Sequence, residues 1–315
     1  MSDEKYFSGY THAAVHETMI ADQVRTNAYK QAICGNPHLF RDKIVLDIGC
    51  GTGILSLFCA QAGAAHVYAV DNSEIVQVTR VIVALNGYSS VISTFQGKIE
   101  DIILPSKVDI IVSEWMGFCL IGEQMLTSVL LGRDKWLKPG GLMFPDSASL
   151  SVFLLGEKAL AEKEDFWKNV HGWDFSKMID LVGSQGYNMK VNSLTILTTP
   201  FPVITLDLLT ANSEQGKSLF GTAFKLTCLK DGKANCFGTF FDVGFTKGNA
   251  PVVLSTSPLQ PATHWNQTCF YLKDSIKCKK GQVVYGSFEI RPENKHAVRV
   301  RTILDDKFAV NAIVG

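Results

Sequence analysis

The sequence predicts a chain with two halves of different fold class, an α/β half with a parallel sheet and then an antiparallel β half. Short β-branched runs alternate with amphipathic stretches before Pro145, which is typical of βαβ units. From about residue 146 onward, apolar and polar residues alternate with a period of two, as in strands with one buried face. The length of 315 residues agrees with two domains at about 150 residues each.

Four apolar runs predict the strands of the parallel sheet, and two amphipathic stretches between the first three predict helices. The strands are expected at 44–48, 67–70, 91–95 and 108–112. The helices are expected at 53–62 and 73–86, with Ser73 as the candidate N-cap of the second and Gly87 just beyond its end. Residues 138–141, Lys-Pro-Gly-Gly, predict a turn before a last apolar run.

The second half is expected to form a sandwich or a barrel of antiparallel strands. Apolar residues at alternate positions predict strands around 237–245, 284–290 and 298–304. The segment 157–189 lacks this alternation and mixes aromatic residues such as Trp173 with charged ones, so it is expected to be helical or irregular.

Positive and negative side chains balance in this chain, with 30 Lys and Arg residues against 30 Asp and Glu residues. No net charge draws the whole molecule toward nucleic acid or an anionic membrane, so a charged ligand must be recognised by a local patch. The basic run at 277–280 is too short to indicate more than a solvated turn. We therefore expect no direct binding of nucleic acid.

The start of the chain and its cysteines bear on its location. Residues 1–5 include no apolar signal stretch, and nowhere do 18 uncharged apolar residues follow one another. The eight cysteines are scattered without a C-x-x-C pair, which favours free thiols in a reducing compartment. We expect no membrane association and a cytoplasmic location, with the nucleus as the alternative.

Three glycines at alternate positions follow the first predicted strand and indicate a nucleotide site. Gly49, Gly51 and Gly53 lie where a sharp turn lets a ligand approach the backbone beside a helix N-terminus. Ile54 stands where a dinucleotide fingerprint needs its third glycine, which argues against a nicotinamide dehydrogenase. Asp71 directly follows the second strand, at the place of a ribose-binding acid. The alternative is a tight turn with a helix-capping acid.

Two acids nine residues apart, Glu114 and Glu123, follow the fourth predicted strand with no basic residue between them. Two carboxylates that converge repel each other unless a cation lies between them. A guanidinium fits best, because its planar fork pairs with carboxylates and it stays charged. A glycosidase pair is one alternative. Another is that Glu123 only begins a helix at 124–138, where acids are favoured.

Four motifs give the chain a resemblance to the protein arginine N-methyltransferases that covers nearly its whole length. They are Tyr-Phe-Ser-Gly-Tyr at 6–10, the glycine run at 45–53, Ser-Glu-Trp-Met-Gly at 113–117 with Glu123, and Thr-His-Trp at 263–265. The Thr-His-Trp form is similar to members that make asymmetric dimethylarginine. The resemblance implies a Rossmann-like methyltransferase domain with a mostly parallel sheet, then an antiparallel β-barrel with a helical dimerisation arm.

The resemblance also implies S-adenosylmethionine as the methyl donor, S-adenosylhomocysteine as its product, and no metal. Asp71 matches the acid that binds the ribose hydroxyls, Glu100 the acceptor of the adenine amino group, and Arg25 the partner of the methionine carboxylate. The positions that match cofactor contacts are Tyr6, Tyr10, His16, Met19, Arg25, Asp47, Gly49, Cys50, Gly51, Thr52, Gly53, Asp71, Ile99, Glu100, Glu114, Met125 and Ser128.

The resemblance also implies which residues bind the substrate and take part in the reaction. Glu114 and Glu123 match the two glutamates that hold the substrate guanidinium, with Trp265 and Met19 beside it. His264 matches the Thr-His-Trp histidine, and Asp22 matches the acid that pairs with it, so these four acids and bases (Glu114, Glu123, His264 and Asp22) are the expected catalytic residues. Either Glu123 or the His264/Asp22 pair accepts the product's proton.

The double-glutamate loop departs from the family at two positions. Phe118 and Gly122 stand where tyrosines often occur. The loss of these hydroxyls bears on processivity and substrate breadth.

Domains and partners follow from the resemblance as expectations. A helical segment at 1–40 caps the cofactor, 41–145 binds it, and 146–315 forms the barrel with an arm at about 157–189. The arm implies a head-to-tail homodimer, and the substrates are arginine-containing proteins or peptides, such as Arg-Gly-rich sequences or histone tails. Two alternatives stay open, a catalytically silent partner subunit that activates a related enzyme, and a small-molecule methyltransferase with an appended β domain.

Overall fold

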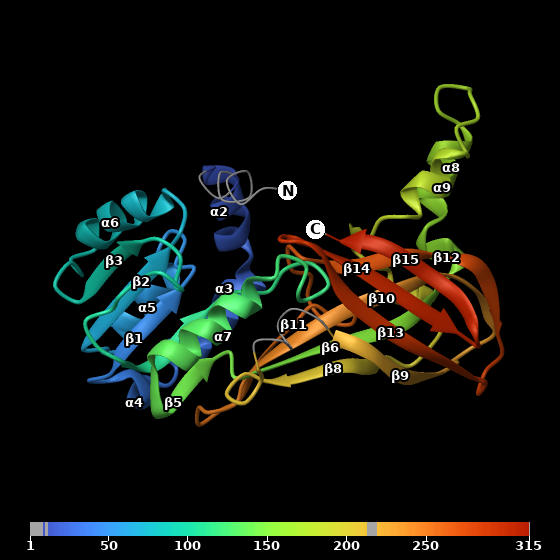
Figure 1. Cartoon of the computed structure of the whole chain (residues 1–315). Helices are drawn as coiled ribbons and strands as arrows, with labels where there is room; N and C mark the ends of the chain where they lie inside the picture. The colour runs from blue at the N-terminus through green and yellow to red at the C-terminus, as the bar shows by residue number, and fades with distance from the viewer. Residues whose placement is uncertain (1–8, 10–11, 213–218, 315) are drawn as a thin grey trace.

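The computed structural model describes residue 9, residues 12–212 and residues 219–314. A parallel-sheet half and a larger antiparallel half lie side by side, and a helical projection rises from the second half (Figure 1). The expected fold class, a Rossmann-like domain followed by a β-barrel, is confirmed. No described helix is long and apolar enough to cross a membrane.

The parallel sheet has the strand order β3-β2-β1-β4-β5. Its strands are β1 (Ile44–Ile48), β2 (His66–Asp71), β3 (Ile92–Gln96), β4 (Val108–Ser113) and β5 (Leu137–Phe144). The β1 and β4 strands are almost fully buried, which accounts for their near-continuous apolar sequences. The order reverses between β1 and β4, and the crevice at the carboxyl ends of such strands is where α/β sheets bind ligands.

The helices of this half differ slightly from those expected. They are α2 (Ala13–Ala21), α3 (Gln23–Cys34), α4 (Pro37–Phe40), α5 (Ile54–Gln61), α6 (Ile75–Leu85) and α7 (Met125–Trp136). The N-cap expected at Ser73 is wrong, since Glu74 occupies that position. The Ser73 backbone N–H and hydroxyl donate instead to Asp71 Oδ1, at 2.8 and 2.7 Å.

Residues 138–141 are part of a strand rather than a free turn. They lie inside β5, and the pairing of β5 with β4 shifts register between Val108 and Ile110. Gly140, with φ +75°, supplies the left-handed conformation. The turn-forming residues therefore form an irregularity within the strand, and parallel pairing resumes at Leu142.

The antiparallel half contains two sheets, ordered β7-β12-β10-β6-β8 with β11 on β10, and β15-β14-β13-β9. Contacts between β8 and β9 and between β12 and β15 close them into a barrel. The strands are β6 (Ser147–Gly156), β7 (Tyr187–Met189), β8 (Phe201–Asp207), β9 (Leu219–Thr227), β10 (Gly232–Phe245), β11 (Val252–Ser255), β12 (Gln267–Cys278), β13 (Val283–Asn294), β14 (Ala297–Leu304) and β15 (Lys307–Val314). The three strands expected here are all present, as parts of β10, β13 and β14.

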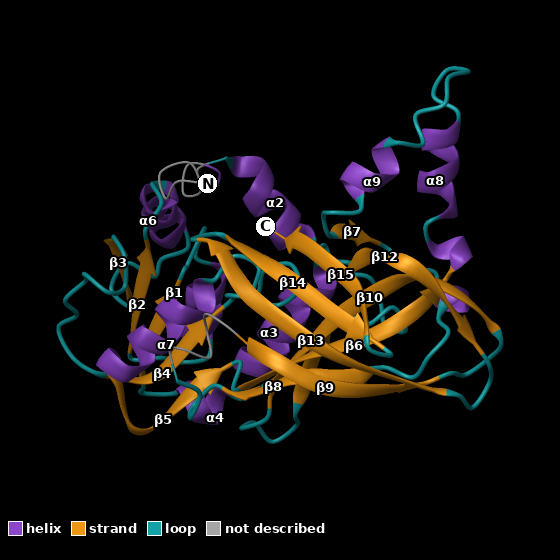
Figure 2. Cartoon of the chain, turned by 45° about the vertical axis from the view of Figure 1, so that its right-hand side comes forward, coloured by secondary structure: helices purple, strands orange, loops and turns teal. Residues whose placement is uncertain are grey.

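The segment between β6 and β7 projects from the barrel into solvent (Figure 2). It contains the short helices η1 (Glu157–Ala159), α8 (Ala161–Lys168) and α9 (Met178–Val182) joined by irregular backbone, in agreement with the expected helical or irregular segment. Phe166, Trp173 and Phe175 on it are 57%, 73% and 45% exposed. We call the segment 157–189, which ends with β7, the arm.

Aromatic side chains join the two halves beside α3. The ring of Phe245 at the end of β10 lies 4.9 Å from that of Tyr29 and 6.2 Å from that of Phe144, and Phe144 in turn lies 5.0 Å from Phe40. Tyr29, Phe40 and Phe245 are almost completely buried. One continuous apolar core therefore fixes the barrel against the parallel-sheet half.

Candidate functional site

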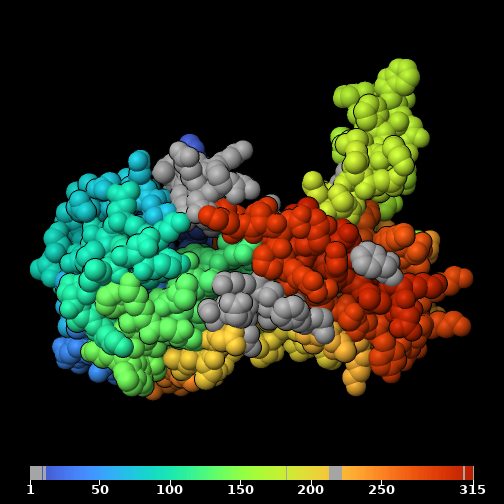
Figure 3. Space-filling model, viewed as in Figure 1, coloured from blue at the N-terminus to red at the C-terminus, as the bar shows by residue number. Residues whose placement is uncertain are grey.

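A cavity of about 940 Å³ lies where the carboxyl edge of the parallel sheet meets the barrel. Its lining comes from both halves: α2, the ends of β1, β2 and β4, the start of α7, and the segments around His264 and Lys295. The space-filling view shows the C-terminal strands, in red, directly against the green part of the first half (Figure 3). A hollow at the junction of two domains is a usual place for a small-molecule site.

The glycine run turns along one wall of the cavity. Gly49, Gly51 and Gly53 have φ of +73°, +52° and +89°, the left-handed region that favours glycine. A Cβ on Gly49 would lie 2.3 Å from Met125 Cε, and one on Gly51 would lie 3.3 Å from the His16 ring. The absence of side chains here keeps the backbone close to the cavity.

Two acids stand on the same wall, and each is already oriented by the protein. Asp71 Oδ2 accepts a hydrogen bond from the Gly51 backbone N–H at 2.9 Å. Glu100 Oε1 accepts one from Ser128 Oγ at 2.6 Å, and Lys135 Nζ donates to the Glu100 carbonyl at 2.8 Å. A carboxylate oxygen accepts more than one hydrogen bond, so both acids keep capacity for a polar ligand.

Three described residues of the predicted set do not line the cavity. Asp47 is fully buried behind the glycine run, where Ser56 Oγ donates to its Oδ2 at 2.6 Å. Burial raises the pKa of Asp47 to about 7. Gly53 is the left-handed residue that begins α5. The remaining predicted residues of the described chain line the cavity except Asp22. Tyr6 and Tyr10 lie outside the described residues.

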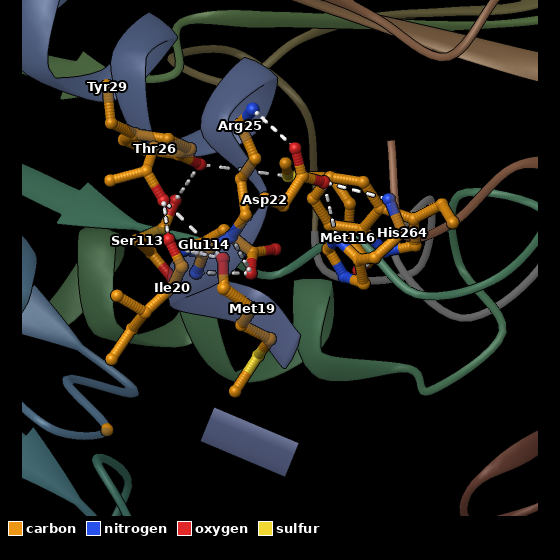
Figure 4. Close-up of polar contacts among 12 residues, drawn as sticks. Met19, Ile20, Asp22, Arg25, Thr26, Tyr29, Ser113, Glu114, Met116 and His264 are labelled. Atoms are coloured by element: carbon orange, nitrogen blue, oxygen red, sulfur yellow. Dashed lines mark hydrogen bonds and ion pairs between the residues drawn. The ribbon is translucent and has the colours of Figure 1, made fainter. Parts of the chain in front are cut away.

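Glu114 follows β4 directly and forms a buried ion pair with Arg25 of α3 (Figure 4). Arg25 Nε and Nη2 donate to Glu114 Oε2 at 3.0 and 2.7 Å. The two side chains are only 6% and 7% exposed. Burial lowers the pKa of Arg25, but the Glu114 carboxylate outweighs this and raises it, so the guanidinium stays charged.

The second oxygen of Glu114 is the most unusual polar atom of the site. Glu114 Oε1 is buried and has no hydrogen-bond partner among the described residues. An unsatisfied buried carboxylate oxygen costs free energy, because it has lost water without gaining a donor. This oxygen is therefore ready to accept a donor from a ligand in the cavity.

Glu123 enters the same cavity from a loop with an unusual backbone. Cys119, Leu120 and Gln124 have φ of +54°, +69° and +58°, although none is glycine. A Cβ on Gly117 would lie 2.8 Å from the Glu123 backbone nitrogen, so the loop folds tightly on itself. Strained backbone of this kind persists only where surrounding contacts hold it.

Asp22 connects α3 to the barrel through His264. Its Oδ1 caps α3 by accepting the Arg25 backbone N–H at 3.0 Å, and its Oδ2 lies 2.7 Å from His264 Nδ1. Although burial raises the pKa of Asp22, hydrogen bonds from His264 and the Arg25 backbone hold it below its ordinary value. With Nδ1 bonded to a carboxylate, a neutral His264 leaves Nε2 as the acceptor of a proton.

Trp265 and Tyr29 hold the backbone on either side of Glu114. Trp265 Nε1 donates to the Met116 carbonyl at 3.0 Å, and the Trp265 side chain is buried although it lines the cavity. Tyr29 Oη donates to the Ser113 carbonyl at 2.9 Å.

Sequence reasoning missed several residues of the lining. The tip of the β13–β14 hairpin, with Asn294, Lys295 and His296, reaches the cavity from the far end of the chain, and Gln124 lies beside it. The sequence carries no motif at this hairpin. The lysine at 98 was likewise missed, although its position two residues before Glu100 was a usable signal.

The cavity combines carboxylates that suit a cation with a glycine-containing wall of the kind that binds nucleotides. Glu114 and Glu123 supply carboxylates that suit a cation, and Asp71 and Glu100 supply acceptors for hydroxyl or amino groups. Among the described residues, no cluster of His, Cys, Asp and Glu is placed to hold a metal ion.

Comparisons with known proteins agree with this geometry. A family model described as the arginine methyltransferase oligomerization subdomain matches residues 146–308, and a methyltransferase-domain model matches residues 45–141. The chain is 40% identical to protein arginine N-methyltransferase 1 of Dictyostelium discoideum, over 98% of this chain and 90% of that protein. It is 44% identical to protein arginine N-methyltransferase 1 of Schizosaccharomyces pombe, over 92% and 86%.

Solved structures give the same result. The chain resembles the Trypanosoma brucei PRMT1 enzyme-prozyme heterotetrameric complex with AdoHcy, with a TM-score of 0.90 and 35% identity over 97% of this chain and 99% of that one. It also resembles Arabidopsis thaliana protein arginine methyltransferase 10, with a TM-score of 0.86 and 28% identity over 98% and 100%.

Proposed function

The chain belongs to the protein arginine methyltransferase family, and on that premise we propose that it converts arginine in protein substrates to mono- and asymmetric dimethylarginine. It is a transferase that uses S-adenosylmethionine. The observation that carries the proposal is the buried Glu114 Oε1, which no described residue satisfies with a hydrogen bond, in the same cavity as Glu123. A guanidinium presents N–H donors in the planar fork that such carboxylates accept.

The residues on the wall of the cavity that contains Gly49 and Gly51 fit S-adenosylmethionine. We assign the ribose hydroxyls to Asp71 and the adenine amino group to Glu100, since both carboxylates are fixed and line the cavity. Arg25 uses three of its five N–H groups on Glu114 and the Met19 carbonyl, which leaves two for the methionine carboxylate. When bound, the cofactor supplies a methyl group on a positively charged sulfur.

The protein's part in the reaction is to orient a weak nucleophile. Glu114 Oε1 and Glu123 hold the substrate guanidinium and draw its positive charge toward the nitrogens they bind, which leaves the third nitrogen more nucleophilic. Because Arg25 fixes Glu114 Oε2, the other oxygen, Oε1, has a defined direction. After transfer, the proton of the methylated nitrogen goes to Glu123 or to His264, whose Nδ1 is held by Asp22.

The product type is tested with an Arg-Gly-rich peptide and the purified chain alone. We expect mass spectrometry to find monomethylarginine and dimethylarginine whose fragmentation releases dimethylamine, as two methyl groups on one nitrogen require. Symmetric dimethylarginine would contradict the product assignment. No transfer to the peptide without a second subunit would support the silent-partner alternative, against which the retained Glu114, Glu123 and His264 count.

We further propose that the chain forms a head-to-tail homodimer through the arm. The match to an oligomerization subdomain supports this, as does the exposure of the aromatic residues on the arm. The outer side of α6 in the other half offers a complementary apolar stripe, since Val78, Val81 and Leu85 are 48%, 58% and 80% exposed.

Trp173→Arg is expected to shift the chain from dimer to monomer, because a charge would enter an apolar interface. Light scattering at micromolar concentration gives the mass of each variant. Leu194→Arg is the control, since Leu194 is 78% exposed and lies outside the arm. A monomeric unmodified chain, or a dimer that Trp173→Arg leaves intact, would contradict the proposal.

A further inference from the structure

Gln124 joins the loop that carries Glu123 to the β13–β14 hairpin of the barrel. Its side-chain Nε2 donates to the Ala297 carbonyl at 2.9 Å and also to the Asn294 carbonyl. These partners lie about 170 residues later in the chain. Gln124, which directly follows Glu123, therefore forms polar contacts with the β13–β14 hairpin.

The geometry of the hairpin suits an amide group. Asn294 and Ala297 face each other as the last pair of β13 and β14, with Lys295 and His296 as the two-residue tip between them. A side-chain amide carries two N–H donors, so one Gln124 side chain serves one carbonyl on each strand. The contact holds both strands of the hairpin at once.

The backbone at Gln124 needs such support. Gln124 has φ +58° and immediately precedes α7, and Cys119 and Leu120 in the same loop are also left-handed. Each such residue costs free energy that tertiary contacts must offset. The Gln124 side chain supplies contacts at the one left-handed residue adjacent to Glu123.

We propose that Gln124 is a positioning residue that keeps the Glu123 carboxylate in its guanidinium-binding place by tying the loop to the β13–β14 hairpin. The inference rests on the proposed function and deepens it. It makes the barrel a contributor to catalysis through the hairpin as well as through His264. Gln124 acts through Glu123 and does not itself need to contact substrate.

The first test replaces Gln124 by Met, which has a similar length but no N–H donor. We expect kcat/KM for an Arg-Gly-rich peptide to fall by roughly 10- to 100-fold, because small displacements of a catalytic group carry large rate penalties. Affinity for S-adenosylhomocysteine, measured by calorimetry, should change by less than about threefold. Gln282→Met is the matched control, since Gln282 accepts a backbone hydrogen bond at an exposed turn of the barrel, and it should retain activity within about twofold.

A double-mutant cycle with Glu123→Gln separates positioning from a general structural role. If Gln124 acts through Glu123, then Gln124→Met should cost less than about twofold in the Glu123→Gln background. The same fold-loss in both backgrounds would overturn the inference, as would full activity of Gln124→Met. Should Gln124→Met not fold, Gln124→Asn, which keeps the amide but shortens its reach, takes its place with the same expectations.

The outcomes distinguish the inference from the proposed function. Failure of the unmodified chain to methylate arginine peptides would overturn the proposed function and this inference with it. An active unmodified chain whose Gln124 variants match it would overturn the positioning role alone.

Discussion

Glu123→Gln should lower kcat for an arginine peptide by roughly two to four decades while cofactor affinity changes little. The substitution keeps the size of the side chain and removes its charge, so electrostatic stabilisation of the guanidinium is lost at the step where nitrogen attacks. The acids assigned to the cofactor, Asp71 and Glu100, are oriented by other residues, Gly51 and Ser128. Single-turnover methyl transfer and calorimetry with S-adenosylhomocysteine measure the two quantities separately.

Glu114→Gln is the informative comparison for this result. Glu114 also fixes the orientation of Arg25, whose remaining N–H groups we assign to the methionine carboxylate, so its loss should weaken both turnover and cofactor binding. Unchanged turnover in Glu123→Gln would contradict the two-carboxylate mechanism. Equal effects of Glu114→Gln and Glu123→Gln on cofactor affinity would contradict the inference that Glu114, through its ion pair with Arg25, affects cofactor binding and Glu123 does not.

Arg25→Met should lower the free energy of unfolding by about 3–5 kcal/mol, the usual cost of leaving one member of a buried ion pair without its partner. The Glu114 side chain is 7% exposed, so its charge has little water to replace the guanidinium. Cofactor affinity should fall as well, because the expected partner of the methionine carboxylate is removed. Denaturant unfolding and calorimetry check the two effects.

Arg299→Met is the matched control for stability. Arg299 Nε and Nη2 both bond the Glu293 carboxylate at 2.7 Å, but that pair is 28% and 32% exposed. A surface pair contributes about 0–1 kcal/mol, so this variant should unfold close to the unmodified chain. Equal destabilisation by the two substitutions would show that burial of Arg25 and Glu114 does not determine how much their ion pair contributes to the free energy of unfolding.

The local pattern of apolar residues predicted most of the fold, because buried strands appear in the sequence as continuous or alternating apolar runs. The run at 44–48 is β1 without change, the glycines follow it, and Asp71 is the last residue of β2, as the βαβ pattern requires. The pattern failed where tertiary contacts override local preference. Lys138 to Gly141 have turn chemistry, yet pairing with β4 draws them into β5. Ser73 has capping chemistry, yet Asp71 is the nearer partner.

Only part of the site could be predicted, because local pattern shows residues that are close in sequence but not the contacts between distant ones. Glu114 and Glu123 stand close in sequence, whereas the pairing of Arg25 with Glu114 joins residues 89 positions apart. The contact of Gln124 with the β13–β14 hairpin depends on how the barrel closes onto α7. No local pattern encodes such a contact.

The central claim, that Glu114 Oε1 and Glu123 form a guanidinium site, is tested most directly by peptide binding. Calorimetry should compare an Arg-Gly-rich peptide with the same peptide carrying Lys for Arg, in the presence of S-adenosylhomocysteine. We predict at least about tenfold tighter binding of the arginine peptide, about 1.4 kcal/mol, and loss of that preference in Glu123→Gln. Equal affinity of the unmodified chain for the two peptides would contradict the claim.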